Sequence, residues 1–97
     1  MEKPTIQEIE KVSQIFKVLS DVTRLKIVLT LKSGERNVTS IAEVVEMEQS
    51  AVSHQLKLLR DNDVVKSRRD GKTIYYSLDD HHVLEILDKT FTHIHHL

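Results

Sequence analysis

The stretch Ile41–Asp61, I-A-E-V-V-E-M-E-Q-S-A-V-S-H-Q-L-K-L-L-R-D, contains two apolar helical patterns separated by a short polar segment. The apolar positions, which recur at helical spacing, are Ile41, Val44, Val45, Val52, Leu56 and Leu59. Glu46–Glu48 has room only for a tight turn, and the second helix is predicted over Gln49–Asp61. The start of the first helix is open, because Asn37 can cap it and so can a capping box that begins at Ser40. Two short helices joined in this way are the helix-turn-helix pattern.

The predicted second helix carries polar side chains that can read DNA. In a helix-turn-helix the first turns of this helix face the major groove. The residues in those turns are Gln49, Ser50, Ser53 and His54. Glutamine can pair bidentately with adenine, and serine can hydrogen-bond to base edges or phosphates. Lys57 and Arg60 lie further along and are predicted to contact phosphates. The alternative is an ordinary polar helix face without a ligand.

Two β-rich runs follow, Val64–Arg69 and Lys72–Leu78. Asp70-Gly71 between them is expected to form the centre of a two-residue type I′ hairpin turn. The apolar positions that alternate toward the core are Ile74, Tyr76 and Leu78. The basic side chains near the tip are Arg68, Arg69 and Lys72. A hairpin beside a recognition helix would bring these three to the neighbouring DNA backbone or minor groove.

Two further helices are predicted before the helix-turn-helix. The first ends near Ser20, and its apolar stripe is Ile6, Ile9, Val12, Ile15, Phe16 and Leu19. Asp21 is the expected N-cap of the second, which runs through Leu31 and is stopped at Gly34. With one more helix after the hairpin, the order is four helices, two strands and a helix (ααααββα). The sequence therefore predicts a mostly α fold with a small β-hairpin, a winged helix-turn-helix.

The last stretch, Asp80–Leu97, is predicted to be an amphipathic helix. Its apolar stripe is Val83, Ile86, Leu87, Thr90, Phe91 and Ile94. Beside the stripe lie four candidate metal ligands, which are Asp80, His82, His93 and His96. His82 and His93 return to nearly the same face of the helix, but about 16 Å of axial rise separates them.

A metal ion needs its nitrogen ligands at about 2 Å, so one straight helix cannot hold both ends of this set. Two antiparallel helices about a twofold axis can. Asp80 and His82 of one chain would then meet His93 and His96 of the other. The sequence therefore predicts a homodimer formed through the N- and C-terminal helices.

The length, charge distribution and composition of the chain are consistent with one domain in which two regions bind two different ligands. The 97 residues allow a single domain, 1–97, in which residues 79–97 form the dimerisation and metal-sensing helix. Residues 49–78 carry six Lys or Arg against three Asp or Glu, whereas residues 79–97 carry one against four. The absence of cysteine leaves only nitrogen and oxygen metal ligands. No run of about 20 apolar residues or targeting segment is present, so a cytoplasmic location without membrane contact is expected.

Three segments carry a family resemblance: Leu19–Val28 (L-S-D-V-T-R-L-K-I-V), Gln49–Leu59 (Q-S-A-V-S-H-Q-L-K-L-L) and Ile74–Leu78 (I-Y-Y-S-L). They resemble the ArsR/SmtB family of metal-responsive repressors over nearly the whole chain. The D-x-H and H-x-x-H at the chain end resemble the zinc- and cobalt-sensing, CzrA-like branch. Two features depart from the family. No cysteine pair accompanies the third helix, which excludes thiol-based sensing, and Glu48 stands where relatives often have a capping serine.

The resemblance implies a homodimer that binds operator DNA when metal-free. Release on metal binding would derepress genes of metal efflux or homeostasis. It also implies that Asp80 and His82 of one subunit, with His93 and His96 of the other, hold Zn(II), a donor set that would accept Co(II) as well.

Three other interpretations remain open. His81 and His95 could add ligands for a six-coordinate Ni(II) or Co(II) sensor. The chain could also be a winged-helix regulator that responds to a non-metal signal. A metalloenzyme is the rival from another class, but four protein ligands would leave no open coordination position, and no substrate cleft or nucleophile motif is evident. We therefore expect no enzymatic activity and no small-molecule substrate.

Overall fold

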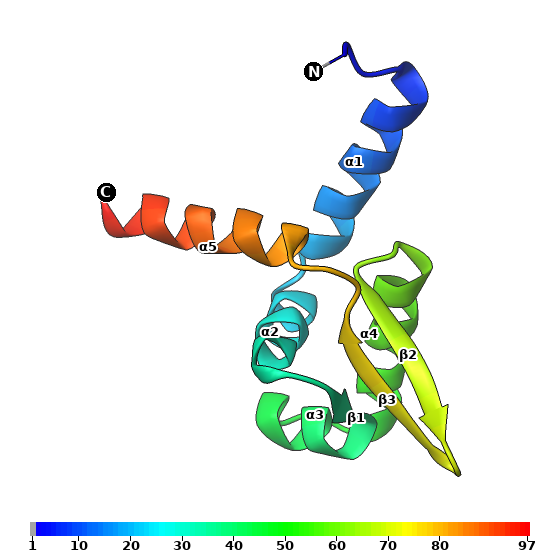
Figure 1. The fold of residues 1–97 in the computed structure, drawn as a ribbon. Helices are drawn as coiled ribbons and strands as arrows, with labels where there is room; N and C mark the ends of the chain where they lie inside the picture. The colour runs from blue at the N-terminus through cyan, green and yellow to red at the C-terminus, as the bar shows by residue number, and fades with distance from the viewer. Residues whose placement is uncertain (1) are drawn as a thin grey trace.

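The computed structural model describes residues 2–97, in which a compact body carries two projecting helices (Figure 1). The elements in chain order are α1 (Ile6–Leu19), α2 (Val22–Thr30), a 3-10 turn η1 (Leu31–Ser33), β1 (Arg36–Asn37), α3 (Val38–Val45), α4 (Gln49–Asp61), β2 (Val65–Asp70), β3 (Thr73–Leu78) and α5 (His82–His95). The body contains α2, α3, α4 and a small sheet, while α1 and α5 extend away from it. This arrangement confirms the winged helix-turn-helix.

Side-chain caps mark where three of the helices begin. Thr5 caps α1 in a capping box with Glu8, and the Asp21 carboxylate accepts a hydrogen bond at the start of α2. The Asn37 side chain accepts from the Ser40 backbone N–H at 2.8 Å, so Asn37 caps α3 and the alternative capping box at Ser40 is wrong. The last helix begins at His82, two residues later than the sequence pattern predicts, because the Asp80 carboxylate accepts the His82 backbone N–H at 2.8 Å.

The sheet has three antiparallel strands in the order β1-β3-β2. The sequence analysis did not predict β1, which is only two residues long and pairs Arg36 with Tyr76. The turn also differs from the prediction. Asp70 pairs with Thr73, so the two central residues are Gly71 and Lys72, and of these only Gly71 has a positive φ, 64°. This conformation fits a type II′ turn, which has glycine at its first central position.

The core lies between α2, α3, α4 and the inner face of the sheet. Its fully buried side chains are Ile27, Val28, Ile41, Val52, Leu56, Leu59 and Val65. Tyr76 is buried beside them, with Ile74 and Leu78 packed against the cluster, which confirms the inward strand face. Val44 of α3 is 52% exposed, because it lies at the edge of the helix face that buries Ile41 and Val45.

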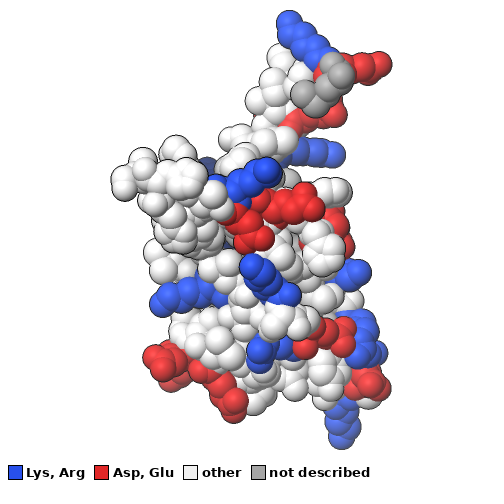
Figure 2. Space-filling model, turned by 60° about the vertical axis from the view of Figure 1, so that its left-hand side comes forward, with Lys and Arg blue, Asp and Glu red and all other residues white. Residues whose placement is uncertain are grey.

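The apolar stripes of α1 and α5 are largely exposed in the single chain. The exposed large apolar side chains of these two segments are Ile6, Ile9, Val12, Phe16, Ile86, Phe91, Ile94 and Leu97. In Figure 2 the projecting end of α5 is accordingly a mostly uncharged, white surface. Within the described residues, no helix is long and apolar enough to cross a membrane.

Candidate nucleic-acid interface and metal site

The six predicted DNA contacts on α4 share its solvent side. The exposed residues are Gln49, Ser50, Ser53, His54, Lys57 and Arg60. The opposite side of the same helix carries Val52, Leu56 and Leu59, whose exposed fractions are 0%. The amphipathic pattern thus fixes which face α4 presents to a ligand, because rotating the helix would expose its apolar side chains.

A groove of about 400 Å³ lies at the start of α4, between this helix, the start of α3 and the hairpin. Its lining residues are Asn37, Val38, Thr39, Gln49, Ser53, Lys72, Thr73, Ile74 and Tyr76. The structure therefore brings Gln49 and Ser53 of α4 together with Lys72 of the hairpin. Sequence reasoning missed the contribution of Thr39 and Thr73. The cap at Asn37 was the available signal, because it places the next residues in the first turn of α3.

The N-terminus of α4 is acidic. Glu48 is the N-cap residue, yet its side chain accepts no capping hydrogen bond. Glu43, Glu46 and Glu48 line a shallow depression around the helix-turn-helix turn. The negative charge of the Glu48 carboxylate interacts favourably with the positive end of the helix dipole. It also lies beside the face of α4 that is predicted to contact DNA.

Further along α4, Lys57 pairs with Asp61 at 2.8 Å. This hydrogen bond lowers the pKa of the Asp61 carboxyl. Both side chains are well exposed, so the ion pair contributes little stability and leaves the Lys57 ammonium accessible.

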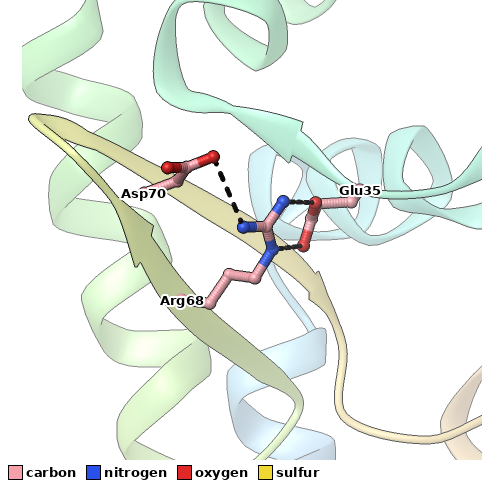
Figure 3. Close-up of polar contacts among 3 residues, drawn as sticks. All are labelled: Glu35, Arg68 and Asp70. Carbon is pink, nitrogen blue, oxygen red and sulfur yellow. Dashed lines mark hydrogen bonds and ion pairs between the residues drawn. The ribbon is translucent and has the colours of Figure 1, made fainter.

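The three basic residues near the tip of the hairpin have different environments. Arg68 forms two hydrogen bonds to the Glu35 carboxylate, from Nε to Oε2 at 2.8 Å and from Nη2 to Oε1 at 2.6 Å (Figure 3). This pairing lowers the pKa of the Glu35 carboxyl and raises the pKa of Arg68. Arg69 and Lys72 are exposed, and neither forms a salt bridge within residues 2–97.

Arg24 of α2 contacts the recognition helix α4, and this contact was not predicted from the sequence. From the start of α2, its Nε donates to the Val18 carbonyl at the end of α1 at 2.6 Å. Its Nη1 donates to Gln55 Oε1 on α4 at 2.8 Å. One guanidinium therefore connects α1 to the recognition helix. No local pattern could have indicated this contact, because Arg24 and Gln55 are 31 residues apart.

The four predicted metal ligands divide into two pairs at opposite ends of α5. Asp80 Oδ2 lies 3.2 Å from His82 Nδ1, and the pKa of the Asp80 carboxyl is lowered, first by its hydrogen bond from the His82 backbone. His93 lies in the last turn and His96 is the C-cap residue. Among the described residues of a single chain, no three His, Asp or Glu side chains come together as a metal site.

The sequence also matches known proteins. Residues 21–67, which contain α2, α3, α4 and the start of β2, match the family described as bacterial regulatory protein, arsR family. A cadmium resistance transcriptional regulatory protein CadC homolog from Staphylococcus aureus is 43% identical over 83 residues, which are 84% of this chain and 69% of that protein. The HTH-type transcriptional regulator NmtR from Mycobacterium tuberculosis is 43% identical over 91 residues, 94% of this chain and 76% of the regulator.

The chain belongs to the arsR family.

A solved structure supports the same conclusion for the fold of this arsR-family protein. The homodimeric winged helix-turn-helix DNA-binding domain of a possible ArsR-family regulator from Mycobacterium bovis superimposes with a TM-score of 0.83 at 28% identity. The match covers all of this chain and 96% of the other. The relatives are transcriptional regulators, which are not enzymes. Membership of the arsR family therefore assigns the chain to transcription regulation through a DNA-binding winged helix-turn-helix.

Proposed function

We propose that this arsR-family protein is a metal-sensing repressor that binds operator DNA as a metal-free homodimer. Binding of Zn(II), or Co(II), to the C-terminal helices would release the DNA and derepress genes of metal efflux or homeostasis. The observation that carries this proposal is the division of Asp80, His82, His93 and His96 between the two ends of a helix whose apolar side chains Phe91 and Ile94 are exposed.

The exposed stripes of α1 and α5 support the dimer. Phe16 is 53% exposed and Ile94 is 49% exposed in the single chain. Apolar surface of this extent on two projecting helices is unfavourable in water and is removed when two copies pack together. The Mycobacterium bovis domain is described as a homodimer, which is consistent with this assembly.

The donor set fits a metal such as Zn(II), because one carboxylate and three imidazoles make a tetrahedral nitrogen and oxygen site. All four side chains are exposed, and within residues 2–97 none of them pairs with a lysine or an arginine, so they are accessible for binding a metal across a dimer. When bound, the ion would link the C-terminal helices of two subunits. The CadC homolog, a cadmium resistance regulator, shows that a metal-related role occurs among close relatives.

The reading head would consist of the solvent side of α4 and the hairpin. Gln49, Ser50, Ser53 and His54 would read bases, and Lys57 and Arg60 would contact phosphates. Lys72 and Arg69 would reach the backbone from the hairpin. Metal can lower the DNA affinity only if it binds more tightly to the conformation that does not fit DNA. By thermodynamic linkage, DNA must then lower the metal affinity by the same factor.

Fluorescence anisotropy of a labelled duplex from upstream of the gene tests this proposal. The protein is first bound in chelator, and Zn(II) is then titrated in at fixed salt, because phosphate contacts make the affinity salt-dependent. We expect tight binding that is lost near one Zn(II) per monomer. Binding that is indifferent to Zn(II), Co(II) and Ni(II) would contradict the metal-sensing role and favour a regulator that responds to a non-metal signal.

The adjacent histidines His95 and His96 provide a matched pair of variants. His96→Gln should bind DNA normally without metal but should no longer be released, because it removes one proposed ligand. His95→Gln should behave like the wild-type protein if the site is a four-coordinate zinc site. Loss of release in His95→Gln as well would instead favour the six-coordinate Ni(II) or Co(II) sensor. Loss of metal-free DNA binding in His96→Gln would show that this residue serves the fold or the DNA contact.

A further inference from the structure

The two neighbouring arginines of the hairpin lie on opposite faces of the sheet. Arg69 pairs across the strands with Ile74, which packs against the core, so Arg69 shares the face that looks toward α4. Arg68 pairs with Tyr75 on the outer face, and its guanidinium lies 4.8 Å from the centre of the Tyr75 ring. Alternation along a strand therefore places only one of these arginines on the side of the recognition helix.

The side chain of Arg68 extends across the outer face of the sheet. It starts on β2, passes over Tyr75 of β3 and ends on Glu35, the residue immediately before β1. Figure 3 shows the guanidinium between the Glu35 carboxylate and the more distant Asp70, whose Oδ2 lies 3.9 Å from Nη1. The contacts of Arg68 thus connect β2, β3 and the residue before β1 on the outer face. We call this set, Glu35, Arg68 and Tyr75, the outer-face clamp.

The position of Glu35 gives the clamp a role in the reading head. Glu35 is followed by β1, whose second residue, Asn37, caps α3. The clamp therefore ties the hairpin to the segment that starts the helix-turn-helix. A bidentate arginine–carboxylate pair has a defined geometry, and stacking on an aromatic ring restricts the guanidinium further. Such an interaction fixes the angle of the hairpin relative to α3 and α4.

A phosphate would have to displace this carboxylate before Arg68 could contact DNA. Glu35 and Asp70 already place two negative charges around the guanidinium, which repel a phosphate at the same position. Arg69 and Lys72 have no comparable partner in the described part of the chain. Of the three cations near the hairpin tip, Arg69 and Lys72 can therefore meet the DNA backbone, whereas Arg68 is already engaged.

We infer that Arg68 is a positioning residue, which together with Glu35 holds the hairpin in the orientation that lets Arg69 and Lys72 reach DNA. This role differs from the contact with the DNA backbone or minor groove that the sequence predicts for Arg68. It rests on the proposed function, since the orientation matters because the protein binds duplex DNA.

The salt dependence of DNA affinity separates the two roles. A lost phosphate contact lowers the slope of log affinity against log salt concentration by about 0.9, whereas a lost positioning contact lowers affinity without that change in slope. We expect Arg69→Gln to reduce the slope by about 0.9. Arg68→Gln and Glu35→Gln should each weaken binding by a similar factor, about three- to tenfold, at an unchanged slope. The double variant should bind no more weakly than either single variant.

Arg68→Lys retains the charge but cannot form the bidentate pair. It should lose as much affinity as Arg68→Gln if orientation is the cause. Full affinity in Arg68→Lys, or a reduced slope in Arg68→Gln, would overturn the inference in favour of a phosphate contact. Tighter binding with a steeper slope in Glu35→Gln would overturn it too, because Glu35 would then only compete with DNA for Arg68.

A measurement without DNA distinguishes failure of this inference from failure of the proposed function. In the free protein, the Arg68 Nε–H resonance should exchange slowly with solvent and should become fast-exchanging in Glu35→Gln, as should the amides of β2 near Arg68. Fast exchange in the wild-type protein would contradict the clamp itself. If the Arg68 Nε–H exchanges slowly but the protein binds no operator duplex, the clamp exists and the proposed DNA-binding function is wrong.

Discussion

At the scale of single residues, Glu48 occupies a position that favours neither helix capping nor DNA binding. It is the N-cap of α4 without a capping hydrogen bond, at the end of the helix that faces the groove. A serine there could accept from a backbone N–H in the first turn, which is typically worth about 1 kcal/mol. The loss of the carboxylate from the helix N-terminus would offset part of this gain.

We therefore predict that Glu48→Ser raises both thermal stability and DNA affinity. Glu48→Gln is the matched control, because it removes the charge without adding a short capping side chain. It should share the gain in DNA affinity, caused by reduced repulsion of phosphates, but not the gain in stability. Thermal melts and duplex titrations at fixed salt measure the two effects. An unchanged affinity in both variants would show that Glu48 does not face the DNA backbone.

At the scale of elements, the sheet depends on the connection between β2 and the segment before β1. The pKa of the Glu35 carboxyl is lowered by its hydrogen bond with Arg68, so the ionised carboxylate is favoured in the folded protein. A group with a lowered pKa contributes stability above its unfolded pKa, about 4.3 for glutamate. This contribution is lost as the pH falls through the folded pKa.

We predict that the difference in unfolding free energy between the wild-type protein and Glu35→Gln is constant near neutral pH and shrinks below about pH 4.3. Urea denaturation at a series of pH values measures this difference. In an Arg68→Gln background, Glu35→Gln should cause a much smaller pH-dependent change, because the main cation responsible for the shift is gone and only the weaker attraction of Lys66 remains. The same pH dependence in both backgrounds would mean that another group perturbs Glu35.

The recognition helix is likewise positioned by an element-to-element contact. Arg24 holds the end of α1 and Gln55 of α4 through one side chain. A rearrangement of α1 at a subunit interface would thus act directly on the helix that reads DNA. This contact provides a physical connection between dimerisation and recognition that does not pass through the hairpin.

At the scale of the whole molecule, the single chain has more exposed apolar surface on α1 and α5 than elsewhere. Both helices project from the body, and they pack on the core only through the end of α1 and the start of α5 (Figure 1). The proposed dimer accounts for this arrangement, because it would bury both stripes and align the two ends of α5 from different subunits.

We predict that Ile94→Glu prevents dimer formation, because it places a charge in the proposed interface. An unpaired buried charge costs several kcal/mol, so the dimer dissociation constant should rise by more than about a hundredfold. Val44→Glu is the matched control, since Val44 is 52% exposed on α3 and Ile94 is 49% exposed on α5. Sedimentation equilibrium should find Val44→Glu dimeric and Ile94→Glu monomeric. A dimeric Ile94→Glu protein would reject α5 as the interface.

The helices, the hairpin and the winged helix-turn-helix could be predicted from the amino-acid sequence, because these features depend on short-range signals. Apolar spacing defined the buried side of α4 at Val52, Leu56 and Leu59, and the caps at Asp21 and Gly34 delimited α2 and η1. The same spacing placed the candidate DNA contacts of α4 on one exposed face. Each of these features is set by residues within a few positions of one another.

The partners that those residues contact, in contrast, depend on how the elements pack in three dimensions. The pairing of Arg68 with Glu35, 33 residues away, depends on strand order and register, and the two-residue strand β1 forms only because β3 is there to pair with it. The turn at Gly71 and Lys72 follows from the same register, since Asp70 pairs with Thr73. Contacts between distant residues arise from the packing of helices and strands against one another, which local sequence patterns do not predict.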